Sequence, residues 1–113
     1  MDIKFKVTED FYFNLVVNSA LPEQAEVDFC NVNTGCRPNP VERRNALSTV
    51  KKAKKVWQFE VLPWAKESGI EILISHPTSQ SRGKIFEKLG WVDMTHRRFK
   101  KKGKKYNFMH YYL

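Results

Sequence analysis

The side chains best suited to acid–base, nucleophilic or metal chemistry are few and widely spaced. His76, His96 and His110 show no metal-ligand spacing and the acidic residues are scattered, so we predict no metal site. Cys30 and Cys36 form neither a disulfide framework nor the paired pattern of a zinc site, and a thiol nucleophile lacks an evident partner. His76 follows a short apolar segment and is the best candidate for a catalytic acid or base. The alternative is that it only forms a turn.

Positive charge is the strongest chemical signal in the sequence. The 113 residues include 20 Lys and Arg against 12 Asp and Glu, which gives a formal net charge of +8. Clustered cations favour a phosphate-bearing partner through counterion release and long-range steering. We therefore predict an anionic partner, either nucleic acid or an acidic protein surface; the alternative is two solvated faces. The first cationic run comprises Arg43, Arg44, Lys51, Lys52, Lys54 and Lys55.

The second cationic run predicts an anion-binding finger. It lies between two segments expected to be strands, with Gly103 at the turn, and aromatic residues flank it. Such a finger suits a phosphate backbone, and its aromatic neighbours would either stack on bases or belong to the core. We expect Tyr106, Tyr111 and Tyr112 to serve packing. The predicted anion-binding residues are Arg97, Arg98, Lys100, Lys101, Lys102, Lys104 and Lys105.

The length and composition predict one domain spanning residues 1–113. A hydrophobic content of 42% and an aromatic content of 13% supply a core and argue against disorder. The first residues lack the apolar region of a signal peptide, and no run approaches about 20 apolar residues. We therefore expect no membrane association and a reducing, cytoplasmic location.

Hydrophobic patterns predict an α/β (α+β) fold with the order β-β-β-α-β-α-β-β. Alternation predicts a hairpin over 3–7 and 11–17, and further strands over 25–32, 70–75, 91–99 and 106–113. Asn39, Pro40 and Glu42 have the pattern of a helix start, after which apolar residues recur every three or four positions. Pro63 should kink or end this helix. A second helix should start at a Thr78 or Ser79 cap and stop at Gly90.

The segment from Ser79 to Trp91 resembles a motif of the GNAT superfamily of N-acetyltransferases. The closest match is Phe-Glu-Lys-Leu-Gly-Trp at 86–91, where the family has Tyr-Glu-Lys-Leu-Gly-Phe on a helix that follows a strand. The resemblance is convincing over about the last 45 residues, and the order of elements extends it over most of the chain. It implies a mixed, mostly antiparallel sheet with two helices, and acetyl-CoA in the splay between the third strand and the strand beginning at Ile70.

The resemblance also implies cofactor-binding positions, several of which depart from the family pattern. The string from Arg43 to Ser48 stands where the family has a glycine-rich diphosphate loop, but it carries Ala46 and Ser48 at the small-residue positions and lies inside the predicted helix. Phe86 replaces a tyrosine that can protonate the departing thiolate. The cofactor-binding residues implied are Arg43, Arg44, Ala46, Ser48, Ser79 and Phe86, and His76 lies beside the implied site.

Two hypotheses follow. The first is a divergent acetyl-CoA-dependent N-acetyltransferase, which the second helix and the arginines favour. The alternative is a GNAT-like protein without catalysis that serves as a structural, host-interaction or nucleic-acid-associated protein, which the departures favour. Compact basic chains of this kind also resemble small phage-encoded proteins, including internal virion components, for which the location would be a host cytoplasm or a virion.

Overall fold

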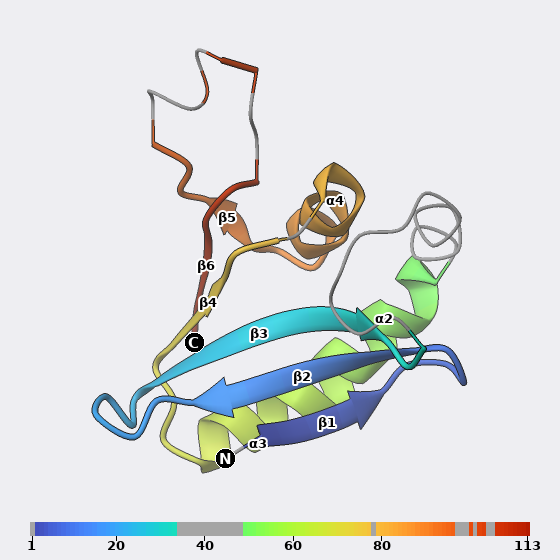
Figure 1. Ribbon diagram of the computed structural model, residues 1–113. Helices are drawn as coiled ribbons and strands as arrows, with labels where there is room; N and C mark the ends of the chain where they lie inside the picture. The colour runs from blue at the N-terminus through green and yellow to red at the C-terminus, as the bar shows by residue number, and fades with distance from the viewer. Residues whose placement is uncertain (1, 34–48, 78, 97–99, 101, 104–105) are drawn as a thin grey trace.

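The computed structural model describes residues 2–33, 49–77, 79–96, 100, 102–103 and 106–113. It is a mixed α+β fold in which a six-stranded, mostly antiparallel open sheet packs against helices (Figure 1). The strand order is β1-β2-β3-β4-β6-β5, and among the described strands β3 and β4 form the one parallel pair. Within the described residues, no helix is long and apolar enough to cross a membrane.

The first three strands form an antiparallel meander, as the alternating pattern predicted. They are β1 (Asp2–Lys6), β2 (Phe11–Val17) and β3 (Gln24–Asn31). The Thr8 hydroxyl accepts the backbone N–H groups of Asp10 and Phe11 in the first turn, and the Asn18 side chain accepts two N–H groups in the second. Side-chain turn chemistry therefore sets where each strand ends.

One continuous helical stretch follows, made of α2 (Val50–Val56), the π-helical segment η1 (Trp57–Val61) and α3 (Leu62–Glu67). The Leu62 N–H donates to the Trp57 carbonyl, which is the wide spacing of a π-turn. Pro63 consequently falls in the first turn of α3, where a missing N–H is tolerated. The helix therefore passes Pro63 and ends before Gly69, which has a φ of 78°. The predicted start near Pro40 lies outside the described residues.

The second half contributes β4 (Ile72–Ser75), α4 (Gln80–Lys88), β5 (Val92–Asp93) and β6 (Met109–Tyr112). The predictions of a Ser79 cap and a stop at Gly90 are confirmed, because the Ser79 side chain accepts the Arg82 N–H and Gly90 has a φ of 102°. In the sheet, β4 lies between β3 and β6. The expectation of two long final strands is wrong, because β5 and β6 are short. Between them, the side chains of Asp93 and Thr95 accept backbone N–H groups of Tyr106 and Asn107 in place of strand pairing.

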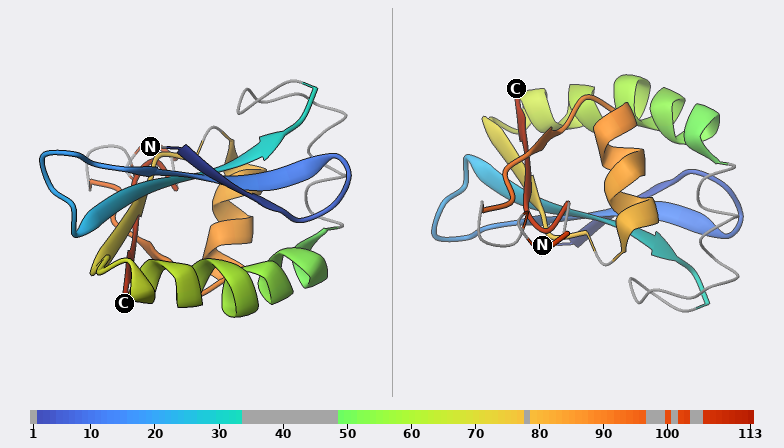
Figure 2. Two further views of the ribbon diagram at one scale, coloured as in Figure 1. Left: turned by 90° about the horizontal axis from the view of Figure 1, so that it is seen from below. Right: turned by 90° about the horizontal axis from the view of Figure 1, so that it is seen from above.

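Both helices lie on one face of the sheet, and no described helix covers the other (Figure 2). The covered face holds a chain of touching rings that joins the long helix to α4. Trp57 contacts Phe13 at 5.4 Å and Trp91 at 5.5 Å between ring centroids, and Trp91 contacts Phe86 at 4.9 Å. Such burial of aromatic area is the main stabilising contribution of a domain this size. The other face is called the open face below.

Candidate functional site

The fork where β3 and β4 separate is the place where the family resemblance implies acetyl-CoA. The two strands pair only over Gln24–Glu26 and Ile72–Ile74, whereas β3 continues to Asn31. At the ends of the β2–β3 ladder, Asn18 N–H donates to the Gln24 carbonyl and Val32 N–H to the Asp10 carbonyl. Because pairing alternates in antiparallel strands, odd-numbered residues of β3 direct their backbone groups away from β2. Their N–H and C=O groups therefore line the fork.

Arg82 from α4 occupies this fork. Its side chain is buried, with 3% of the residue exposed, and its Nη1 donates a hydrogen bond to the Phe29 carbonyl. Burial lowers the pKa of the guanidinium, and the nearby Asp28 opposes that shift. An extended ligand entering the fork would have to displace this arginine from the backbone carbonyl that it binds.

Titratable groups also flank the fork on the open face. Burial, followed by the neighbouring Glu26, raises the pKa of the Asp28 carboxyl, while Arg82 and His76 act in the opposite direction. His76 Nδ1 lies 3.7 Å from the Glu26 carboxylate in a pair with both side chains about half exposed. His76 follows β4 at the fork, and its ring packs against Phe108 with 4.8 Å between the ring centroids, so its proposed catalytic role stays a prediction.

The other implied cofactor residues serve local structure where the structure describes them. Ser79 caps α4, and Phe86 is 1% exposed and packs edge-on against Trp91. A ring at that depth belongs to the core. Arg43, Arg44, Ala46 and Ser48 lie outside the described residues, so their predicted role stays a prediction.

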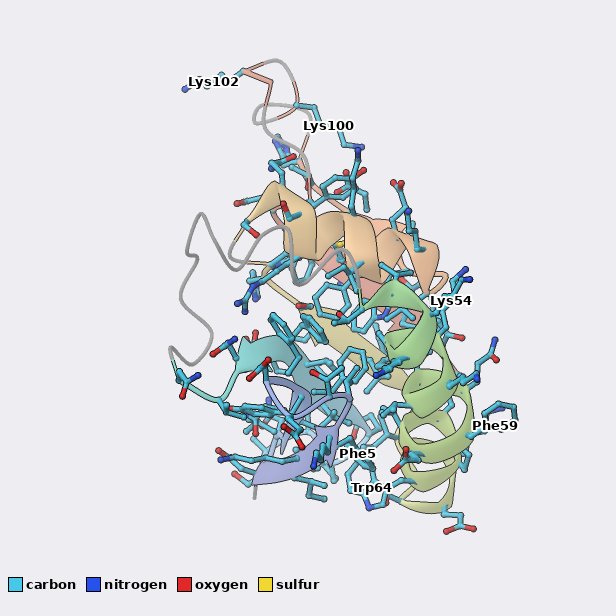
Figure 3. The ribbon with its side chains drawn as sticks, turned by 90° about the vertical axis from the view of Figure 1, so that its right-hand side faces the viewer. Phe5, Lys54, Phe59, Trp64, Lys100 and Lys102 are labelled. Atoms are coloured by element: carbon cyan, nitrogen blue, oxygen red, sulfur yellow. The ribbon has the colours of Figure 1, made fainter. Side chains whose placement is uncertain are left out.

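Both cationic runs are represented by exposed lysines. All four lysines of α2 are exposed, as are Lys100 and Lys102, and among the described residues no lysine forms an ion pair with a carboxylate. Lys54 lies on the long helix, whereas Lys100 and Lys102 lie at the end of the molecule away from Trp64 (Figure 3). The remaining predicted finger residues, Arg97, Arg98, Lys101, Lys104 and Lys105, lie outside the described residues.

Two polar side chains anchor the base of the finger. Asp93 Oδ1 accepts the Thr95 backbone N–H at 2.9 Å and the Thr95 hydroxyl, and Oδ2 accepts the Tyr106 N–H at 3.3 Å. The Thr95 hydroxyl oxygen accepts the Asn107 N–H at 2.8 Å. Burial acts to raise the pKa of Asp93, but these hydrogen bonds and Lys100 together lower it below its ordinary value. The network joins the two ends of the finger.

Tyr106 fixes the finger to α4. Its backbone has a φ of 55°, which is unusual for a residue other than glycine, and its side chain is buried against Gly83. A Cβ placed on Gly83 would lie 2.1 Å from the Cβ of Tyr106. Only glycine therefore permits this close approach of α4 to the end of the finger.

The open face carries two further features, of which sequence reasoning did not single out the second. Along β6, a row of aromatic rings contains Phe108, His110 and Tyr112. Tyr112 is 61% exposed, so its predicted packing role is wrong, while the packing roles of Tyr106 and Tyr111 are confirmed. At the opposite edge, a pocket of about 310 Å³ is lined by Lys4, Lys6, Thr8, Glu9, Phe11, Tyr12 and Val32.

Cysteine and metal chemistry add little to the site. Cys30 is buried near the end of β3 and is disulfide-bonded, which the sequence analysis did not expect. A disulfide is typical of oxidising compartments and does not favour the reducing, cytoplasmic location that the sequence predicted. That location stays a prediction. In the described part of the chain, no three His, Cys, Asp or Glu residues gather in a way that could hold a metal ion.

Comparison with known proteins identifies no relative. No protein-family model, no curated protein and no solved structure matches this chain. Function must therefore be argued from the geometry alone.

Proposed function

We propose that this chain is a GNAT-like domain that works as a nucleic-acid-binding protein rather than as a transferase. The observation that carries the proposal is the set of exposed lysines, on α2 and on the finger, that make no ion pairs among the described residues. Cations that are not neutralised within the protein are available to replace the counterions of a polyanion.

The GNAT-like part of the proposal draws on topology as well as on the Ser79–Trp91 segment. A meander of three strands, a long helix, a parallel β3–β4 pair, a second helix and a final antiparallel pair follow one another in the described order. The fork between β3 and β4 lies where the resemblance implied acetyl-CoA. These features support the resemblance but do not supply an activity.

The binding function is favoured over catalysis by the contents of the fork. Arg82 holds the Phe29 carbonyl, so a cofactor would lose a backbone acceptor unless the arginine moved. Phe86 is buried and has no acidic proton. By contrast, Asp93 and Thr95 bind the backbone of Tyr106 and Asn107, which joins the segments that precede and follow the finger.

The test is the salt dependence of binding to labelled DNA, measured by fluorescence anisotropy. We expect the logarithm of the affinity to fall linearly with the logarithm of salt, with a slope of about −0.7 to −0.9 per phosphate contact. Replacing Lys100, Lys101, Lys102, Lys104 and Lys105 by Gln should weaken binding and flatten the slope. The matched variant with Arg at the same positions should retain both, because it keeps the charge. Binding that survives the Gln variant unchanged would remove the finger from the proposal.

A transferase remains the second candidate, because the fork carries a carboxyl of raised pKa beside His76. A carboxylate or an imidazole, the side-chain groups of Asp28 and His76, can accept the proton of an amine in acyl transfer. This candidate predicts that acetyl-CoA raises the melting temperature of the protein by several degrees. The control is free adenosine diphosphate, which tests phosphate affinity without the acyl arm. No shift with acetyl-CoA at millimolar concentration would eliminate the transferase.

A further inference from the structure

A row of aromatic rings runs along β6 on the open face. The centroids of Phe108 and His110 lie 4.5 Å apart, and those of His110 and Tyr112 lie 5.7 Å apart. The ring of His76, which follows β4, packs at a tilt against Phe108. His110 Nδ1 and the Tyr112 hydroxyl are 3.0 Å apart and share a hydrogen bond, which fixes the orientation of both rings. These four side chains are called the aromatic row.

The register of the sheet explains why the row faces outward. Met109 is fully buried and Tyr111 packs on Trp57, so the residues that alternate with them must lie on the opposite face. Across the strands, His110 lies opposite Ile74 of β4 and Val92 of β5, and Val92 is 49% exposed. The row is therefore set in a partly apolar surface with no described helix above it.

The surroundings of the row are positively charged at one end and negatively charged along the side that faces β3. Phe108 is the member of the row nearest to the finger in sequence, and Lys102 extends toward the sheet side of the molecule, away from the long helix (Figure 3). On the β3 side, Glu26 and Asp28 border the row, with Glu26 paired to His76. A phosphate backbone would be attracted at the finger and repelled on the β3 side, so its favourable path follows β6.

We infer that the aromatic row is a base-stacking platform for a single-stranded nucleic acid whose backbone is held by exposed lysines, of which the structure describes Lys100 and Lys102. Tyr112 is 61% exposed, so the end of the row offers an accessible ring on which an unpaired base can stack. Stacking on aromatic side chains tolerates any base sequence, because every base has a π-face. This inference rests on the proposed function, and it adds the strand state of the ligand and the surface that reads it.

A second copy of the chain is a poorer occupant of the same surface. Each chain carries a formal net charge of +8, so two copies meeting face to face would repel each other at low salt. A nucleic acid supplies the opposite charge and the flat apolar rings together. Charge complementarity therefore favours the polyanion.

The test compares three anionic probes by fluorescence anisotropy or by competition: a labelled oligothymidylate of about 12 nucleotides, the corresponding duplex, and inorganic polyphosphate, which has no bases. We expect the single strand to bind more tightly than the duplex. Tyr112→Ala should weaken single-strand binding by about tenfold and leave polyphosphate binding unchanged. Tyr112→Phe should bind like the original protein, because it keeps the ring.

Phe59→Ala is the matched control. Phe59 is 74% exposed, but it projects from the long helix away from the sheet (Figure 3), so its loss should not change binding. Circular dichroism on each variant establishes that it is folded. A Tyr112→Ala variant that is folded and binds the single strand normally would overturn the inference, as would equal affinity for single strand and duplex.

Failure of the proposed function has a different outcome. If none of the three probes binds at about 50 mM salt, the nucleic-acid proposal itself fails. If polyphosphate and duplex bind through the finger but Tyr112 has no effect, only the stacking platform fails. A dimer that Tyr112→Ala dissociates in sedimentation experiments would assign the open face to a second copy and overturn the inference.

Discussion

The two faces of the sheet use aromatic residues in opposite ways. On the covered face, Trp57, Phe86 and Trp91 are at most 4% exposed and contact one another between the helices and the strands. On the open face, Phe108, His110 and Tyr112 also touch one another, yet no described element covers them. The difference teaches that aromatic content alone does not separate a core from a binding surface; the position of the helices does.

Removing one ring from each face gives the largest expected contrast. Trp57→Ala should lower the free energy of unfolding by about 3–5 kcal/mol, because it leaves a cavity where three rings meet. Tyr112→Ala should change it by less than about 0.5 kcal/mol, because the side chain is mostly exposed. Urea unfolding measures both. Equal losses would mean that the open face is covered in solution.

The contact between α4 and Tyr106 should show the next largest effect. Gly83→Ala should lower the free energy of unfolding by about 1–3 kcal/mol, because the added methyl collides with the Cβ of Tyr106 and backbone must move. Its control is Ser81→Ala on the same helix, which adds no Cβ atom. A neutral Gly83→Ala substitution would show that the finger is not fixed to α4.

Asp93→Asn should destabilise the base of the finger to a smaller extent. The pKa of Asp93 is lowered in the folded protein, so its stabilising contribution is present above its ordinary pKa and is lost as pH falls through the folded value. Melting temperatures measured from neutral to acidic pH should therefore converge for the variant and the original protein. Curves that stay parallel at all pH values would contradict this origin.

Asp28→Asn should have the smallest effect on stability, and it should stabilise the protein, whereas the substitutions above destabilise it. The pKa of Asp28 is raised by burial and by Glu26, so the folded state disfavours the ionised carboxyl. The variant should be slightly more stable at neutral pH, and the gain should fade as pH falls through the raised pKa of the folded protein and be absent below the ordinary pKa of aspartate. A loss of stability at neutral pH would show that the attraction between Asp28 and Arg82 outweighs burial.

Local patterns were sufficient for much of the fold. Alternation predicted β2 at its observed bounds and placed β1 and β3 within one residue or two, because each has one face against the core. Ser79 and Gly90 marked the ends of α4, because a cap and a left-handed residue act over a few neighbours. The cationic character of the finger also followed from composition.

The candidate site was less accessible to such reasoning. The final strands were predicted too long, because Asp93 and Thr95 bind backbone groups more than ten residues away in sequence. Arg82 stood at a position read as part of a helix motif, and nothing local indicates its contact with Phe29, 53 residues earlier. Tyr111 and Tyr112 are adjacent tyrosines, so residue type does not distinguish them. Only the pairing of β6 in the sheet places Tyr111 against the core and Tyr112 on the surface.

By itself, the sequence determined the basic charge, the succession of strands and helices and the caps that separate them, because these depend on residue types and on short-range periodicity. The tertiary structure alone decided that Arg82 fills the fork between β3 and β4 and that both helices cover one face. Those outcomes depend on which distant segments meet, and hydrophobic periodicity states that a face is apolar without stating what packs on it.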